Sequence, residues 1–316
     1  MKKKFQLTDL FTSYAQFCKC APGADTSADF DSLQGSAVAA RKRIVAILSD
    51  EVFGVIIELD ADNVVRYYLQ TAMANLTLAT QIAFDAVNRR KNDVNVYKYE
   101  LEGMKRAYME NFYNSMDSLI SELMEPIDDD ETEEMKALNR AWLKTRYFTM
   151  VNSCKVQNAD EFDSIYPIDL SYLFFFRCIP LQKEALDEGM SGYFDRIDEM
   201  GENEQEIDET DHFAEVNKKV VSILKLALVK KTVAKALRRF DILEFPVTIR
   251  NLFEDNTASR SGSDEATRAN NLATQLDGEV EDLLHQVDML LEAGDGNSYE
   301  SLSFDNRPDD NMYMMP

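Results

Sequence analysis

The chain has 316 residues, 45% hydrophobic and 10% aromatic, which is enough to bury a sizeable core and argues against disorder over its whole length. Its formal net charge of −23 opposes DNA and anionic membranes, so a protein that wraps nucleic acid through clustered Lys and Arg is not expected. The length suits one large domain or two smaller ones.

Residues 1–35 are predicted to form an N-terminal arm, because this stretch is polar and is broken by Pro22 and Gly23. Cys18 and Cys20 lie here, and the spacing of the four cysteines fits neither a disulfide framework nor a zinc site. We therefore expect reduced thiols in a cytosolic setting.

Residues 36–126 are predicted to form a first helical repeat of about three helices, with Ser36 capping the first of them. The second helix carries apolar residues at a helical period, and most are small, so neighbouring helices can approach closely. These positions are Val65, Leu69, Ala72, Leu76, Ala79, Ala83 and Ala86. Residues 67–84 carry no charge but include Gln70 and Asn75, so a buried helix is expected there and not a membrane span.

Residues 127–169 are predicted to link two repeats through an acidic loop and a short β segment. Residues 145–151 are β-branched and aromatic, which favours a strand or a hairpin with residues 155–157. Asn158 can cap a brief helix that Pro167 ends.

Residues 170–293 are predicted to form the second helical repeat, with Pro180 near the first turns of its opening helix. Its last apolar stripe begins near Ser263 and ends near Gly294. The tail, residues 294–316, is polar with isolated apolar residues, which is typical of a segment that orders on a partner. These apolar residues are Tyr299, Leu302, Phe304, Tyr313, Met314 and Met315.

A sequence pattern shared by the two predicted repeats suggests that one helical unit occurs twice. Residues 72–79 are echoed by residues 227–234, with Ala, Thr and Ala at matching places. Chance similarity between two amphipathic helices is the alternative. The predicted fold is mainly α: two repeated helical bundles joined by a short β-containing segment, with extended N- and C-terminal arms.

A basic run on the first long helix of the second repeat is, with the tail, the predicted partner interface. Its members are Lys230, Lys231, Lys235, Arg238 and Arg239. One interpretation is a solvated basic face. The other is that this face meets an acidic stretch of a neighbouring copy, residues 128–134 or 202–211, in a head-to-tail contact that can close into a ring.

No catalytic, cofactor or metal site is predicted. His212 and His285 lie at no metal-binding spacing, and the 11 glycines form no phosphate loop. The carboxylates are so abundant that none stands out as an acid–base pair. We therefore expect neither a cofactor nor enzyme activity, with an enzyme built on scattered carboxylates and a bound metal as a minor alternative.

Two stretches in the middle of the chain resemble a known family. Residues 142–147, which read Trp-Leu-Lys-Thr-Arg-Tyr, and residues 158–171 are similar to the central signature of a duplicated all-helical family. That family occurs in phages and prophages of Bacteroides-type hosts, and the resemblance spans about residues 30–293. Such proteins are similar to the head–tail connector, or adaptor, proteins of tailed phages.

The resemblance implies a twelve-membered ring of identical copies in the neck of the virion, assembled in the host cytoplasm. It also implies two other partners, a portal protein above the ring and a tail or stopper protein below it. DNA would pass through the ring without specific binding. The family offers no catalytic residues to transfer, and the insertion at residues 251–264 departs from its pattern.

The leading expectation is therefore a non-enzymatic virion structural protein, a head–tail connector. The alternative is an intracellular helical module that binds or regulates another protein. A concentrated apolar groove would favour that alternative.

Overall fold

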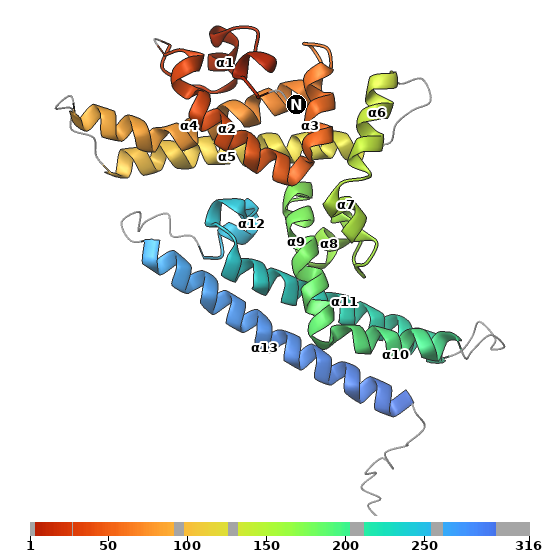
Figure 1. Cartoon of the computed structure of the whole chain (residues 1–316). Helices are drawn as coiled ribbons and strands as arrows, with labels where there is room; N and C mark the ends of the chain where they lie inside the picture. Colours follow the sequence, from red (N-terminus) through yellow and green to blue (C-terminus); the bar gives the residue numbers. More distant parts are fainter. Residues whose placement is uncertain are drawn as a thin grey trace, which may run out of the picture.

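In the computed structural model the chain is mainly helical (Figure 1). The structure describes residues 4–26, 28–91, 98–125, 132–202, 212–253 and 262–294, and it contains no β-strand within these ranges. The long helices are α2 (Phe30–Leu48), α4 (Val64–Lys91), α5 (Lys98–Met124), α9 (Tyr172–Ala185), α11 (His212–Arg239) and α13 (Gly262–Gly294). The shorter elements are η1 (Leu7–Asp9), α1 (Tyr14–Cys20), α3 (Asp50–Glu58), α6 (Glu133–Trp142), α7 (Arg146–Val151), α8 (Ala159–Ile165), η2 (Leu186–Met190), α10 (Ser191–Glu202), η3 (Ile242–Glu244) and α12 (Val247–Arg250).

The upper layer of Figure 1 is built on α4 and α5, which pack along each other as a hairpin. Both α1 and α2 pack against α4, and α3 contacts α6. The middle of α4 is surrounded by these neighbours, so that Ala72, Met73, Ala74 and Asn75 are fully buried. The prediction of a buried uncharged helix here is confirmed. In the described part of the chain, no helix combines the length and apolarity that crossing a membrane requires.

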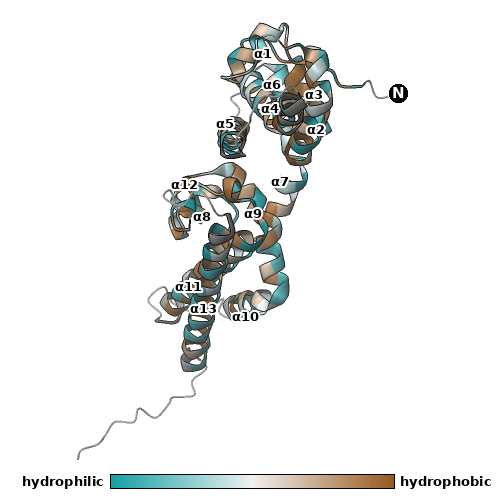
Figure 2. Cartoon of the chain, turned by 90° about the vertical axis from the view of Figure 1, so that its left-hand side faces the viewer, coloured by the Kyte–Doolittle hydropathy of each residue, from teal (hydrophilic) through white to brown (hydrophobic). Residues whose placement is uncertain are grey.

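The lower layer consists of α11 and α13, which pack along each other, with α10 against α11 (Figure 1). The chain enters this layer through α9 and turns into α10 at Gly189, whose φ of 130° is a conformation that favours glycine. Figure 2 shows the resulting elongated shape, with the layer of α4 and α5 at one end and the far ends of α11 and α13 at the other.

Helix α9 joins the two layers. It contacts α5 above, α11 below and α7 at its side, and most of its side chains are buried, among them Phe174, Phe175 and Phe176. One hydrophobic cluster therefore runs from the N-terminal segment through α4, α5 and α9 into α11 and α13. A smaller cluster lies under α10 and the far ends of α11 and α13. Because the main core crosses both halves of the chain, the architecture does not support two repeated bundles.

The two segments that share a sequence pattern, residues 72–79 in α4 and 227–234 in α11, occupy a similar environment. Thr77 in α4 and Thr232 in α11 are fully buried. Each hydroxyl donates to the carbonyl oxygen four residues earlier, with an oxygen–oxygen distance of 2.7 Å. The elements around the two helices differ, since η3 and α12 lie between α11 and α13. The similarity that the structure supports is thus local to the two helices.

The predicted N-terminal arm is wrong for residues 4–26 and 28–35, which fold onto α4. Leu7, Leu10, Phe11 and Phe17 are at most 1% exposed. Buried side chains of α4 hold this segment in place by hydrogen bonds to its backbone: Gln70 donates to the carbonyl of Leu10 and Asn75 to that of Cys20, both at 2.9 Å. Helix α2 begins at Phe30 with Asp29 as its cap, and Ser36 lies inside it, where it donates to Gln81 at 2.7 Å.

The predicted β segment is also wrong, because residues 146–151 form α7. Tyr147 and Val151, one helical turn apart, are both buried, and α7 packs against α9. A short aromatic and β-branched run fits a strand or a helix equally well, and here tertiary packing decides between them. The neighbouring predictions are confirmed: Asn158 caps α8, accepting the N–H of Glu161 at 2.7 Å, and Pro180 lies inside α9. The C-terminal tail, residues 295–316, lies outside the described residues.

Candidate functional site

A group of adjoining cavities lies where the upper layer meets the lower layer, between α5 and the segment that begins α9. Three cavities of about 380, 160 and 560 Å³ share wall residues there. Tyr113, Leu173 and Glu244 line both the first and the second of these cavities. Asn114 and Asp117 line both the first and the third. We call this connected hollow the junction groove.

One face of α5 forms the upper wall of the junction groove. Glu110, Asn114, Asp117 and Ser121 follow a spacing of four, three and four residues, which places them on one face of a helix. The opposite face of α5 is apolar and fully packed into the core through Phe112, Met116 and Leu119, among others. The amphipathic pattern of α5 thus presents its polar side to the groove.

The lower wall includes a strained turn before α9. Asp169 and Leu170 have φ angles of 55° and 52°, the left-handed region that costs a non-glycine residue about 1–2 kcal/mol. Two carboxylates hold the turn. One oxygen of Asp163 accepts the N–H groups of Ile168 at 2.8 Å and Leu170 at 3.0 Å. Asp169 accepts the N–H of Thr248 at 3.0 Å and also its hydroxyl, which ties the turn to α12.

Asp117 connects the two walls. Its carboxylate accepts the N–H of Leu173 at 2.9 Å, in the first turn of α9. Burial raises the pKa of Asp117 above its ordinary value, while hydrogen bonds from Leu173, Ser171 and Tyr172 oppose part of that rise. Ser171 caps the same helix by accepting the N–H of Phe174 at 3.1 Å.

Two arginine pairs lie at the other walls of the groove. Arg177 donates twice to one oxygen of Glu244, at 3.0 and 2.7 Å, and its guanidinium lies 5.0 Å from the ring centre of Phe240. Arg250 pairs with Glu110 at 3.0 Å. Between these pairs, burial raises the pKa of the Tyr113 hydroxyl, and the nearby Glu244 charge adds to the rise. The phenol therefore stays protonated at neutral pH.

The five residues of the predicted basic interface form ion pairs within the chain, while Arg238 and Arg239 remain exposed. Lys230 pairs with Glu279 at 2.6 Å, Lys231 with Asp277 at 2.8 Å, Arg238 with Asp277 at 2.6 Å, Lys235 with Glu184 at 2.9 Å and Glu188 at 2.6 Å, and Arg239 with Glu184 at 2.5 Å. Hydrogen bonds from Arg239 and Lys235 lower the pKa of Glu184 to about 2. These ion pairs tie α11 to α9 and α13.

The other predicted contact segments fall mostly outside the described residues. This holds for Tyr299, Leu302, Phe304, Tyr313, Met314 and Met315 in the tail, and for most of the acidic stretches 128–134 and 202–211.

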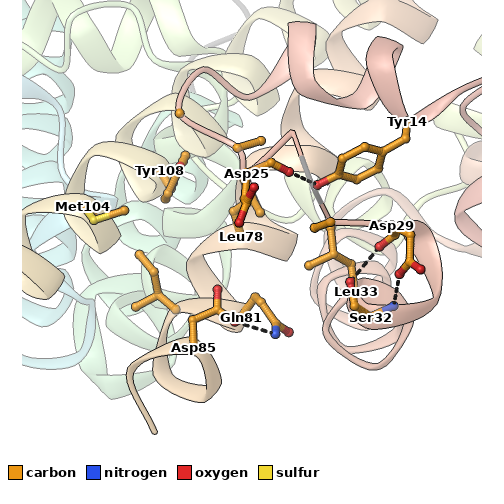
Figure 3. A pocket seen from close by; sticks show the side chains of 14 residues that line it. Tyr14, Asp25, Asp29, Ser32, Leu33, Leu78, Gln81, Asp85, Met104 and Tyr108 are labelled. Atoms are coloured by element: carbon orange, nitrogen blue, oxygen red, sulfur yellow. Dashed lines mark hydrogen bonds between the residues drawn. The ribbon is translucent and has the colours of Figure 1, made fainter. Parts of the chain in front are cut away.

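A second cavity, of about 540 Å³, lies between the α1–α2 connection and the α4–α5 hairpin (Figure 3). Asp25, Asp29 and Asp85 line it together with Tyr14 and Tyr108. The polar groups shown in Figure 3 are engaged with each other: Tyr14 donates to the carbonyl of Asp25 at 2.8 Å, Asp29 caps α2, and Gln81 donates to Asp85 at 2.9 Å. Across the described ranges, no three His, Cys, Asp or Glu side chains lie together as metal ligands would.

Sequence reasoning did not find the junction groove, because its residues come from separate parts of the chain. One signal was present: the polar spacing from Glu110 to Ser121 on α5. Another was the motif at residues 158–171, which contains the strained turn at Asp169 and Leu170 but was used only for its family resemblance. Comparison of the chain with family models, with curated proteins and with solved structures finds no match.

Proposed function

We propose that the protein is a non-enzymatic structural protein of a phage virion, a head–tail connector that assembles with copies of itself into a ring. In this proposal the ring lies between a portal protein and a tail or stopper protein. The motifs at residues 142–147 and 158–171 support it by resemblance.

The structural observation that carries the proposal is the continuous core through α9. It makes two long helical hairpins into one elongated unit, in which α5 and α11 both pack on the same short helix. A subunit of a wall around a channel needs this stiffness along its length. The net charge of −23 would keep such a wall from gripping the phosphates of passing DNA.

The contacts between copies are proposed to use surfaces other than Lys230, Lys231, Lys235, Arg238 and Arg239, which form ion pairs within the chain. Large apolar side chains that stay in solvent are better candidates. Phe84 near the far end of α4 and Leu252 after α12 are each 60% exposed. Exposed apolar residues of this size are common where subunits meet.

Electron microscopy of the purified full chain, alone and mixed with the portal protein from the same genome, tests the proposal. Closed rings containing this chain are the expected result. Particles from the same host should also contain its peptides when analysed by mass spectrometry. A chain that stays monomeric in both samples, with none of its peptides in particles, would contradict the proposal.

A second candidate function is a helical module that binds another protein and acts as a single subunit. The junction groove favours it, because a hollow that combines apolar and charged walls is a common form of protein-binding site. A monomer that binds one protein partner in a one-to-one complex would select this function over the ring.

A further inference from the structure

We propose that the junction groove binds a cationic amphipathic segment of a different polypeptide, one that carries large apolar side chains flanked by Lys or Arg. The inference rests on the protein-binding part of the proposed function and does not need the ring. Both the charge and the apolar surface of the groove favour this one kind of ligand.

The lining of the groove is net negative. Its three cavities are lined by five carboxylates and three arginines, a difference of two negative charges. The carboxylates are those of Glu110, Asp117, Glu122, Asp169 and Glu244, and the arginines are Arg43, Arg177 and Arg250. Arg250 pairs with Glu110 and Arg177 with Glu244, so the excess negative charge lies on Asp117, Glu122 and Asp169. A positively charged ligand is therefore favoured.

The apolar part of the groove is unusually exposed. Leu170 is 52% exposed and Val247 is 54% exposed, and the bonds from Asp169 to Thr248 bring their two segments together. Tyr68 lines the same cavity as Leu170, and its ring lies 5.9 Å from that of Tyr67, which is also 52% exposed. Exposed large apolar side chains in and beside a groove often mark a contact surface.

The strained turn adds to this argument. Leu170 has a left-handed backbone conformation that glycine would adopt without cost. Because the residue is about half exposed, burial of its side chain offsets little of that cost. A leucine in such a position is explained if its side chain is covered by a partner. Strain of this kind is often retained at binding sites.

The small polar side chains of α5 leave space for a bound segment. Asn114, Ser118 and Ser121 line the cavity of about 560 Å³ beside Leu170 and can form hydrogen bonds with a peptide. A second copy of this chain is a poor occupant, because a protein of net charge −23 would bring more negative charge to an acidic groove. The partner is therefore a different protein with a basic segment.

The experiment uses the full chain and a fluorescent designed helix of about 18 residues, made of Leu and Lys and long enough to cover the groove. A matched helix of Leu and Glu is the charge control. Leu170→Ser with Val247→Ser removes the apolar rim without changing the charge, and Met289→Ser changes an exposed apolar residue on α13. Binding is followed by fluorescence anisotropy at physiological salt.

The Leu/Lys helix should bind the wild type. Its affinity for the double variant should be at least about ten-fold weaker, and its affinity for the Met289→Ser variant should equal that for the wild type. The Leu/Glu helix should not bind. Equal binding of the Leu/Lys helix to all three proteins would show attraction to net charge alone and would overturn the proposal, as would no binding at all.

Circular dichroism checks that each variant is folded. If the double variant does not fold, the single variants Glu122→Gln and Val247→Ser are tested in its place. Each should weaken binding of the Leu/Lys helix. The two proposals fail separately. Loss of the expected binding pattern overturns the groove whatever the mass of the wild type, and the ring is decided by the samples with and without the portal protein and by the peptides found in particles.

Discussion

The carboxylate of Asp117 on α5 accepts the backbone N–H of Leu173 in the first turn of α9, with an oxygen–nitrogen distance of 2.9 Å. This bond joins the upper layer to the helix that leads into the lower layer. It also supplies an acceptor for one of the N–H groups that the start of a helix leaves without a partner. Asp117 is therefore a cap that comes from a different helix.

Replacing Asp117 by Ala should lower the free energy of unfolding by about 1–2 kcal/mol, the usual loss when a helix cap is removed. Asp117→Asn keeps a side-chain oxygen that can accept the same N–H, so it should be less destabilising. Urea unfolding of the full chain measures both. Equal stability of the Ala variant and the wild type would show that the contact contributes nothing.

Phe17→Ala should destabilise the protein by about 3–5 kcal/mol, because its ring is fully buried between the N-terminal segment and the rest of the core. The control is Met289→Ala, at a residue of α13 that is 50% exposed, where a change below about 0.5 kcal/mol is expected. Thermal unfolding compares them. A Phe17→Ala variant as stable as the control would mean that residues 4–26 are an arm after all.

The left-handed turn before α9 predicts a difference between two small substitutions. Leu170→Gly removes the strain at φ 52° and Leu170→Ala keeps it, so the Gly variant should be the more stable by about 1 kcal/mol. In an ordinary loop the order is reversed, since Gly has more freedom in the unfolded chain. Chemical unfolding of the two variants side by side gives the sign.

The ion pairs of Glu184 predict a specific pH dependence. Because the pKa of Glu184 is lowered from 4.5 to about 2, its charged form stabilises the fold above pH 4.5, and this contribution is lost as the pH falls towards 2. The wild type should therefore be more stable than Glu184→Gln at pH 7, and the gap should close between pH 4.5 and 2. The effect is modest because Glu184 is partly in solvent.

Glu134→Gln, at an exposed position on α6, is the control for this pH series. It should follow the wild type at every pH, since Glu134 is exposed, whereas Glu184 accepts from Lys235 and Arg239 of α11. A gap for Glu184→Gln that stays constant down to pH 2 would contradict the assignment of these ion pairs.

Local signals predicted the helices well. Asn158 before α8, Pro180 inside α9 and the glycine that ends α13 each act on neighbouring residues, so their effect can be read from the sequence. The uncharged middle of α4 was recognised as buried for a similar reason. Its polar side chains have to find partners, and Gln70 and Asn75 find them in the N-terminal segment.

Features that depend on distant residues could not be predicted. The basic residues of α11 look free in the sequence, because Glu184 and Asp277 lie far from them along the chain. The N-terminal segment looks like an arm because its few apolar residues, such as Phe11 and Phe17, are separated by polar ones. The junction groove needs three segments to meet, and only the face of α5 is periodic.

The mass of the assembled protein tests the central claim most directly. Mass photometry of the full chain, alone and with the portal protein from the same genome, should show a closed assembly many times the 36.1 kDa of one copy. A single species of 36.1 kDa in both samples would contradict the claim that this protein is built to form a ring.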